Sequence, residues 1–416
     1  MCDAVVYAKK LILPSDQANV LQSLHMAFAF SQTGVPTALF PGVNLRKAER
    51  AAAPASGARA REGERPGGAA GQGRDAFFQA WLASCGIRTV PEEWKVLNGG
   101  HKGLYSARFA LRIAGALLRG PRSLFYARDI GEATLLSRLL PLAGKKRPVF
   151  IYEMHETLFL HHRDVEGRSD WRETWRKERA ALAAADGLVV VNRAIADIVV
   201  PEFGFKGPVL EEPNGVNETV FRPVDLFSAS APWPRGDDAV SLVYIGNMHP
   251  GKGVQQLVGA MALLPERFRL TIIGRGGEAV LRELDTLINA VPKGRERIRM
   301  LGHLPQGELW EQCRGAHMSI VPQQEGGGYF SPLKLNESLA LGLPTVCTPL
   351  DLFAGQREYV FSSRDASPEG LAEAIGALAG MPEEAKRLRD QGLEAAKRRT
   401  WKARAARILE FADTLR

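Results

Sequence analysis

Residues 240–274 read VSLVYIGNMHPGKGVQQLVGAMALLPERFRLTIIG. The apolar run 240–245 predicts a buried strand, residues 253–264 carry apolar side chains at helical spacing, and residues 269–273 predict a second strand. A strand, a helix and a strand in so short a segment indicate two parallel strands joined by a crossover helix. This segment therefore predicts an α/β fold.

The same alternation extends on both sides of this segment. Further strands are expected at 4–7, 37–40, 124–127, 149–152, 187–191, 298–301, 318–321 and 344–347, and further helices at 17–33, 132–140, 171–185, 279–290, 309–315 and 334–341. The stretch 229–238, ASAPWPRGDD, is typical of a domain boundary. We therefore predict two doubly wound, Rossmann-like domains, 1–212 and 239–395, with a linker at 213–238 and an interdomain cleft that both domains face. Residues 393–416 predict one long helix, of which 396–416 packs back toward the N-terminal domain.

Length and composition exclude several classes of protein. The 416 residues suffice for two or three domains, and 45% hydrophobic with 24% charged residues is ordinary for a globular protein. No run of about 18 apolar residues predicts a membrane span, and the four cysteines lack the spacing of a disulfide framework or a zinc site. The N-terminus has no signal-peptide pattern, so a cytoplasmic protein is expected.

The net charge of +8 favours anionic partners. Part of it lies in residues 46–75, which are expected to form a disordered insertion because they offer almost no large apolar side chain to bury. A basic arm for nucleic acid is the alternative there, but the segment has no aromatic residue to stack on bases, so nucleic acid is not an expected partner. The basic stretches 168–179 and 386–407 are interpreted as solvated helix faces, with peripheral contact to an anionic membrane at its inner face as the alternative.

The strongest chemical signal is the segment 331–346, SPLKLNESLALGLPTV. It predicts a loop that leads into a helix, with Lys334 at the helix start and Glu337 in its first turns. Unpaired backbone N–H groups and the helix dipole attract phosphate to such a terminus, and Lys334 adds a full positive charge. Glu337 can accept two hydrogen bonds from a ribose diol. The alternative is that both side chains lie on a solvated helix face.

Two glycine turns favour the ligand-binding interpretation. Gly246 ends the strand 240–245, and Lys252 stands between glycines at the start of the next helix, which is the pattern for binding a nucleoside diphosphate. Gly274 and Gly276 follow the second strand and allow backbone to approach a ligand closely.

The chain resembles the retaining, nucleotide-sugar-dependent glycosyltransferases of family 4, which have the GT-B fold. The resemblance is carried by the segments above and by three more: 298–322 (IRMLGHLPQGELWEQCRGAHMSIVP), 186–200 (DGLVVVNRAIADIVV) and 211–223 (EEPNGVNETVFRP). The resemblance implies that Lys252 meets the donor diphosphate. Glu337 matches the second glutamate of the family's Glu-x7-Glu motif, which holds the nucleotide ribose.

The chain departs from the family pattern at two positions. The arginine that usually follows Gly246 is replaced by Asn247, and Lys334 of the Ser331-Pro332-Leu333-Lys334 segment is expected to supply that charge. The family's first glutamate is replaced by Tyr329, so Glu325 is expected to take its place at the donor sugar.

In the first domain, polar residues follow the predicted strands, where ligands bind in open α/β sheets. Glu153 and His155 stand at alternating positions after the strand 149–152 and so share one face. His155 resembles the family's active-site histidine; a core histidine and a metal site with Glu153, His161 and His162 are the alternatives. Arg128 follows the strand 124–127 and is expected at the same cleft, with a structural salt bridge as the alternative.

Asp16, Gln17 and Asn19 stand between the first strand and the first helix, where the family usually has a glycine-rich loop. With Arg128 and Glu153 they are the expected acceptor-binding residues. Helix capping by Asp16 or by the neighbouring Ser15 is the alternative.

The resemblance implies an enzyme that moves a hexose or amino-hexose from a nucleotide-diphosphate sugar, UDP favoured over GDP, to an acceptor hydroxyl with retention. The acceptor is a glycan, a lipid-linked glycan or a small molecule, and His155, Lys252 and Glu325 are the expected catalytic residues. No Asp-x-Asp-type motif is placed to bridge the diphosphate, so no metal and no other cofactor are expected. The alternative is a nucleotide-sugar-binding protein with lost or altered transferase activity, because Asn247 and Tyr329 alter the usual donor site.

Overall fold

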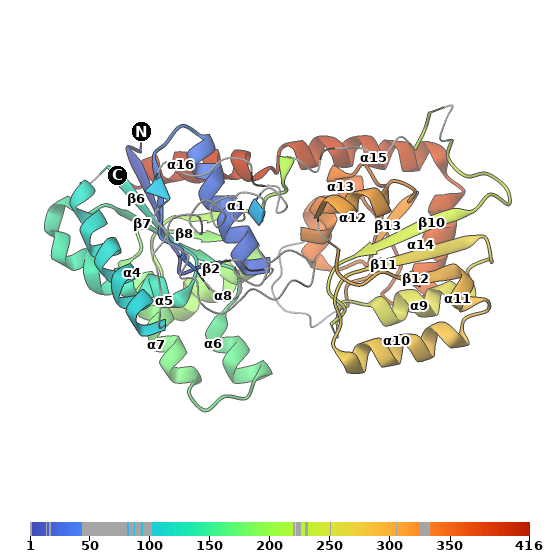
Figure 1. The fold of residues 1–416 in the computed structure, drawn as a ribbon, viewed down its shortest axis with the longest axis horizontal. Helices are drawn as coiled ribbons and strands as arrows, with labels where there is room; N and C mark the ends of the chain where they lie inside the picture. The colour runs from blue at the N-terminus through green and yellow to red at the C-terminus, as the bar shows by residue number, and fades with distance from the viewer. Residues whose placement is uncertain are drawn as a thin grey trace, which may run out of the picture. The chain divides into compact units, whose positions relative to one another are not determined.

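The computed structural model of the chain describes residues 2–13, 15, 18–43, 81–82, 87, 93–94, 102–120, 122–218, 221, 226–228, 232–249, 251–304, 306–324 and 333–416. The chain divides into two compact units, each with its own parallel sheet and hydrophobic core (Figure 1). Unit 1 comprises Met1–Glu212 and Trp401–Arg416, and unit 2 comprises Pro213–Thr400. The predicted insertion 46–75 lies outside the described residues and stays a prediction.

Unit 1 is built on a seven-stranded parallel sheet in the order β5-β3-β1-β6-β7-β8-β9. Its strands are β1 (Ala4–Ala8), β3 (Thr37–Leu39), β5 (Glu93–Trp94), β6 (Ser123–Ala127), β7 (Val149–Met154), β8 (Gly187–Val190) and β9 (Val209–Glu211). Its main helices are α1 (Ala18–Gln32), α4 (Lys102–Ala116), α5 (Ile130–Leu139), α7 (Trp171–Ala184), α8 (Arg193–Phe203) and α16 (Trp401–Thr414), with a short α6 (Leu158–Leu160). Because β1 pairs with β3 on one side and β6 on the other, the order of winding reverses at β1, which is where open α/β sheets bind ligands.

A small parallel pair of strands, β2 (Ile12–Leu13) and β4 (Gly42–Val43), follows the ends of β1 and β3. The sequence pattern did not predict this pair, since two-residue strands carry no periodic signal.

The long helix predicted at 393–416 is wrong as one element. Residues before the break belong to α15 (Pro382–Lys397) in unit 2, and α16 begins only at Trp401 and returns to unit 1. Ala405, Ile408 and Ala412 of α16 are buried in the core of unit 1, and α16 packs along α1 (Figure 1). The basic stretch 386–407 therefore spans two helices, and Arg404 within it is buried rather than on a solvated helix face.

Unit 2 is built on a six-stranded parallel sheet in the order β12-β11-β10-β13-β14-β15. Its strands are β10 (Val240–Ile245), β11 (Phe268–Ile273), β12 (Ile298–Met300), β13 (Met318–Val321), β14 (Thr345–Cys347) and β15 (Phe361–Ser362). Its helices include α9 (Val254–Leu263), α10 (Glu278–Ala290), α11 (Gly294–Arg297), α12 (Gln306–Cys313), α13 (Leu333–Ala340), α14 (Pro368–Ala379) and α15. The predicted doubly wound order is confirmed, and here the winding reverses at β10, between β11 and β13.

Part of the predicted linker 213–238 packs onto unit 2. Leu226 and Trp233 are buried in its core, the rings of Phe227 and Trp233 stack with centroids 5.2 Å apart, and the Trp233 indole N–H donates to the Ala379 carbonyl. The Pro and Gly residues of this stretch predicted a linker, so the burial of its apolar side chains was not predicted.

Within the described ranges, no helix is both long and apolar enough to cross a membrane.

Candidate functional site

The carboxyl ends of β10 and β11 form two glycine turns in close contact. The Gly246 N–H donates to the Ile273 carbonyl at 2.7 Å, and the Met248 N–H donates to the Arg275 carbonyl at 2.6 Å. A Cβ on Gly274 would overlap the carbonyl oxygen of Gly246, so glycine is required for the two turns to approach. The sequence therefore placed Gly246, Gly274 and Gly276 correctly at one edge of the sheet, since Gly276 forms a bridge with Met248.

Gly253, just before α9, has a positive φ of 72° and lies against the Pro322 carbonyl, which follows β13. We predict that Gly253→Ala destabilises unit 2 by about 3 kcal/mol or more, because a left-handed backbone and an overpacked contact both disfavour Cβ. Thermal unfolding measures this. Gly315→Ala is the matched control, since Gly315 is exposed with open space where its Cβ would lie and should change stability by less than about 1 kcal/mol. Equal effects of the two substitutions would contradict the packing argument.

Lys334, in the first turn of α13, reaches back over the first glycine turn. Its Nζ donates to the Tyr244 hydroxyl at 2.5 Å, lies 3.4 Å from the Asn247 carbonyl oxygen and sits 4.5 Å from the centroid of the Tyr244 ring. A Cβ on Gly246 would overlap the Lys334 side chain. The ammonium group thus lies at the turn of Asn247, the position for which the sequence resemblance implies an arginine, and the side chain of Asn247 itself is exposed.

Lys252 lies near Lys334 and brings a second positive charge to this edge. Its Nζ donates to the Gln323 amide oxygen at 3.4 Å, and Gln323 is a buried residue directly after β13 and Pro322. Burial lowers the pKa of Lys252, and the charge of Lys252 in turn contributes to lowering the pKa of Lys334. Two lysines held close enough to repel each other in a half-buried setting favour an anionic ligand between them.

Glu337 lies on the next turn of α13. Burial raises its pKa to about 7, while the charge of Lys334 opposes the shift. Burial and the charge of Lys252 lower the pKa of Lys334 to about 7, while Glu337 opposes that shift. A half-buried carboxyl near Lys334 can bind vicinal hydroxyls of a ligand whose phosphates meet the lysines.

The rest of the predicted donor site is only partly described. Leu333 begins α13 and is half-buried, whereas Glu325, Tyr329, Ser331 and Pro332 lie outside the described residues and stay predictions.

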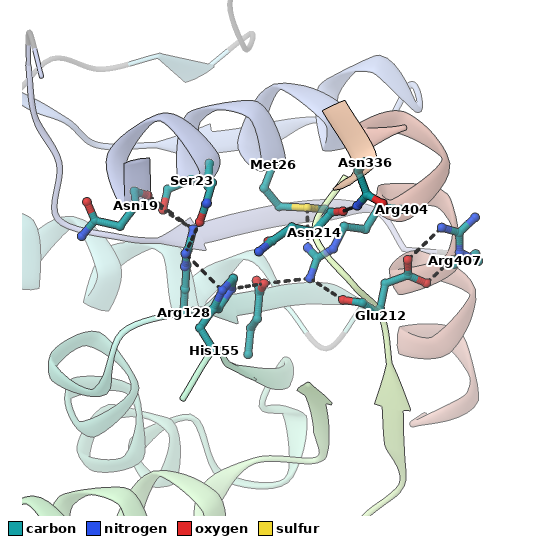
Figure 2. A network of polar contacts seen from close by, with 12 residues as sticks. Asn19, Ser23, Met26, Arg128, His155, Glu212, Asn214, Asn336, Arg404 and Arg407 are labelled. Carbon is teal, nitrogen blue, oxygen red and sulfur yellow. Dashed lines mark hydrogen bonds and ion pairs between the residues drawn. The ribbon is translucent and has the colours of Figure 1, made fainter. Parts of the chain in front are cut away.

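In unit 1, a buried ion pair joins the end of β7 to α16. Glu153 and Arg404 are each 1% exposed, and the Arg404 Nη2 donates to the Glu153 Oε1 at 2.7 Å (Figure 2). Arg404 also donates to the Glu212 carbonyl and contacts the Met26 sulfur. Burial alone would raise the pKa of Glu153, but Arg404, His155 and Arg128 together hold it well below its usual range. Glu153 is therefore a carboxylate at neutral pH.

His155 follows β7 and is held between Glu153 and Arg128. The distance from its Nε2 to the Glu153 Oε1 is 2.5 Å, and that from its Nδ1 to the Arg128 Nη2 is 3.2 Å. A guanidinium only donates hydrogen bonds, so Nδ1 must accept and the proton must lie on Nε2, which donates to Glu153. Burial and the charge of Arg128 lower the pKa of His155 to about 4, which agrees with a neutral ring. Its two ring nitrogens are thus both engaged within unit 1.

Arg128 directly follows β6 and binds the first turns of α1. Its Nη1 lies 3.4 Å from the Asn19 carbonyl and 3.5 Å from the Ser23 hydroxyl, and its Nη2 lies 2.5 Å from the Gln22 amide oxygen. It makes no ion pair within the described ranges, so the alternative of a structural salt bridge is wrong for them. Asn19 has an exposed side chain, while Asp16 and Gln17 lie outside the described residues.

The predicted metal alternative finds no support among the residues the structure describes, where no group of three or more His, Cys, Asp or Glu side chains could hold an ion. His161 and His162 instead lie beside Glu166, at 3.4 Å and 3.8 Å from its carboxylate oxygens.

Sequence reasoning missed Tyr244, Gln323 and Arg404. Tyr244 and Gln323 stand near the carboxyl ends of β10 and β13, so their positions at strand ends could have indicated them. Arg404 had no such signal, because its partner Glu153 lies 251 residues away in the sequence.

The two parallel sheets define the GT-B fold, which solved structures share with this chain at low sequence identity. Anabaena HepE, solved in complex with UDP, matches 99% of this chain and 100% of that chain at 14% identity with a TM-score of 0.65. Sucrose-phosphate synthase from Thermosynechococcus elongatus matches 99% of both chains at 16% identity, also with a TM-score of 0.65.

Residues 239–380 of unit 2 match the family model described as glycosyl transferases group 1. The chain is 30% identical over 219 residues to a phosphatidyl-myo-inositol mannosyltransferase of Mycobacterium leprae, covering 50% of this chain and 54% of that protein. It is 26% identical over 249 residues to a D-inositol 3-phosphate glycosyltransferase of Xylanimonas cellulosilytica, covering 56% and 58%. The chain thus spans little more than half the length of these relatives.

Proposed function

We propose that the protein is a glycosyltransferase that moves a hexose or amino-hexose from a nucleotide-diphosphate sugar, UDP favoured over GDP, to an acceptor hydroxyl with retention of configuration. The observation that carries this proposal is the cluster of Lys252, Lys334 and Glu337 around the glycine turns of unit 2. It lies within the segment that matches the glycosyl transferases group 1 model. The UDP bound in the HepE structure is consistent with a nucleotide-sugar donor.

In this proposal the lysines stabilise the leaving group. Cleavage of the bond between the sugar and the diphosphate leaves negative charge on a phosphate oxygen. Lys252 and Lys334 would stabilise this charge as it develops. Glu337 holds the ribose, and the protein's own cations take the part that a metal plays in other enzymes, so transfer is proposed to need no metal. The acceptor oxygen would form its bond to the anomeric carbon on the face that the leaving group vacates, while a phosphate oxygen of the departing diphosphate accepts the hydroxyl proton, and this gives retention.

The pH dependence of donor binding follows from the two pKa values near 7. Lys334 carries its charge below about pH 7, and Glu337 accepts hydrogen bonds best above about pH 7, so both are in the binding form together near neutrality. We predict a bell-shaped affinity for UDP-glucose, whose diphosphate diester does not titrate in this range. Calorimetric titration between about pH 5.5 and about pH 8.5 measures it.

Two variants separate the limbs of that profile. Lys334→Met should remove the alkaline limb, and Glu337→Gln should remove the acid limb. A flat profile for the unmodified protein would contradict the assigned protonation states.

The direct test of the proposal combines binding with turnover. A nucleotide sugar should raise the midpoint of thermal unfolding, because ligand binding stabilises the native state by mass action. UDP-, GDP-, ADP- and dTDP-sugars form the panel, and release of the free nucleotide in the presence of candidate acceptors measures transfer. Binding without turnover across a broad acceptor panel would favour the alternative, a nucleotide-sugar-binding protein, and no shift with any donor would overturn both.

A further inference from the structure

Arg128 carries a positive charge that no described carboxylate pairs with. Its hydrogen-bond partners among the described residues are all uncharged: the Asn19 carbonyl, the Ser23 hydroxyl, the Gln22 amide and the neutral His155 ring. The partners of buried or half-buried guanidinium groups are more often carboxylates, because a charge is costly to remove from water without an opposite charge.

The other charges around Arg128 are already matched. Of the described carboxylates around it, Glu153 forms an ion pair with Arg404, and Glu212 forms a bidentate pair with Arg407 at 2.7 Å and 2.8 Å (Figure 2). Two further acidic residues near the ends of β1 and β6 are matched as well, since Asp129 binds Lys9 and Glu132 lies beside Lys10. Of the described charged groups named here, Arg128 is therefore the one that has no ion-pair partner.

The surplus charge lies where the fold binds ligands. Arg128 directly follows β6, and β6 pairs with β1, the strand at which the winding of unit 1 reverses. The residue is half-buried, and Figure 2 shows its side chain between the first turns of α1 and His155. The charge of Arg128 is felt by the ionisable groups at this edge of the sheet, because it helps to lower the pKa values of Glu153 and His155.

We infer that Arg128 binds an anionic group, a phosphate or a carboxylate, of the acceptor molecule. This inference rests on the proposed transferase function and narrows its acceptor class: the hydroxyl that receives the sugar belongs to a molecule that carries a negative charge. Burial and the charge of Arg128 keep His155 neutral, and its Nε2–H donates to Glu153, so its Nδ1 accepts from Arg128 and orients the guanidinium without neutralising it. A neutral acceptor would leave this charge unmatched in the complex.

The test uses the full chain saturated with UDP, so that a titrated anion cannot occupy the donor site on unit 2. With histidine labelled by ¹⁵N, inorganic phosphate should move the ring signals of His155, which are assigned by their loss in His155→Asn. Arg128→Gln should weaken phosphate binding by about tenfold or more, because hydrogen bonds between charged groups are lost. Arg128→Lys should retain part of the affinity, since it keeps the charge.

The matched control is Arg193→Gln, which removes one positive charge from an exposed, Asp197-paired position elsewhere on unit 1 and should leave phosphate affinity unchanged. Thermal unfolding of each variant shows whether it is folded. In a transfer assay, Arg128→Gln should lose selectivity for glucose 6-phosphate over glucose as acceptor.

Three outcomes would overturn the inference: phosphate binding that disappears once UDP is bound, which assigns the anion to the donor site; equal phosphate affinity in Arg128→Gln; or no response of His155. Failure of the proposed function is distinct from these, because it appears as absence of UDP binding in the unmodified protein, whatever phosphate does at Arg128.

Discussion

Lys252→Ala should weaken UDP binding by about ten- to a hundredfold, since a hydrogen bond between charged groups contributes about 1.5–3 kcal/mol. The lysine lies beside Gln323 at the carboxyl edge of the sheet, and burial lowers its pKa, so the negative charge of a diphosphate would favour its charged form. Calorimetric titration with UDP measures the effect.

Two comparisons make the Lys252 result specific. Uridine has no phosphate, so its affinity should be nearly the same in Lys252→Ala and in the unmodified protein. Lys293→Ala removes an exposed lysine of the same unit that is paired with Glu266, and it should leave UDP affinity unchanged. An equal loss for uridine and UDP would show that the substitution damages the fold of the site rather than its contact with phosphate.

Arg404→Met should destabilise unit 1 by about 3–5 kcal/mol, because it leaves the buried Glu153 carboxylate without its cation. Denaturant unfolding measures the change. The double variant Arg404→Met with Glu153→Gln should recover much of the loss, since it removes both charges. Lys402→Met, at an exposed position on the same helix, should change stability by no more than about 0.5 kcal/mol.

The loss in Arg404→Met should also depend on pH in a definite direction. The folded-state pKa of Glu153 lies below the usual 4.5, so its ion pair stabilises the unmodified protein above that pH and the stabilisation is lost on acidification. Without Arg404, burial raises the pKa of Glu153, and acid then relieves the cost of the buried charge. The difference in stability between the two proteins should therefore be larger at about pH 7 than at about pH 5, and a pH-independent difference would exclude an ionic origin.

Local pattern was enough to predict the α/β class and the meeting of the glycine turns with Lys334 at one edge of unit 2. The apolar run 240–245 matches β10 residue for residue, and Gly246, Gly274 and Lys334 meet there because carboxyl ends of neighbouring parallel strands share one edge. The same rule placed Glu153 and His155 together at the end of β7.

The contacts that the sequence did not predict are those made across long separations or by short elements. In the sequence, nothing distinguishes Arg404 from the other basic residues of its helix. It is buried against Glu153 because α16 packs onto α1. The break between α15 and α16 was missed because residues 398–400 carry neither proline nor glycine to end a helix. The segment around Trp233 was predicted to be a linker because it is rich in Pro and Gly. In the structure Trp233 instead packs into the core of unit 2.

The return of α16 to unit 1 also sets an order of assembly during synthesis. Proteins usually fold domain by domain from the N-terminus as the chain emerges. Here unit 2 is continuous, whereas the core of unit 1 includes Trp401, Ile408 and Ala412 and can be completed only after all of unit 2 has been made. Unit 1 is thus the first to leave the ribosome but the last to complete its core. The face of α1 that α16 covers stays without this helix until nearly all of the chain has been synthesised.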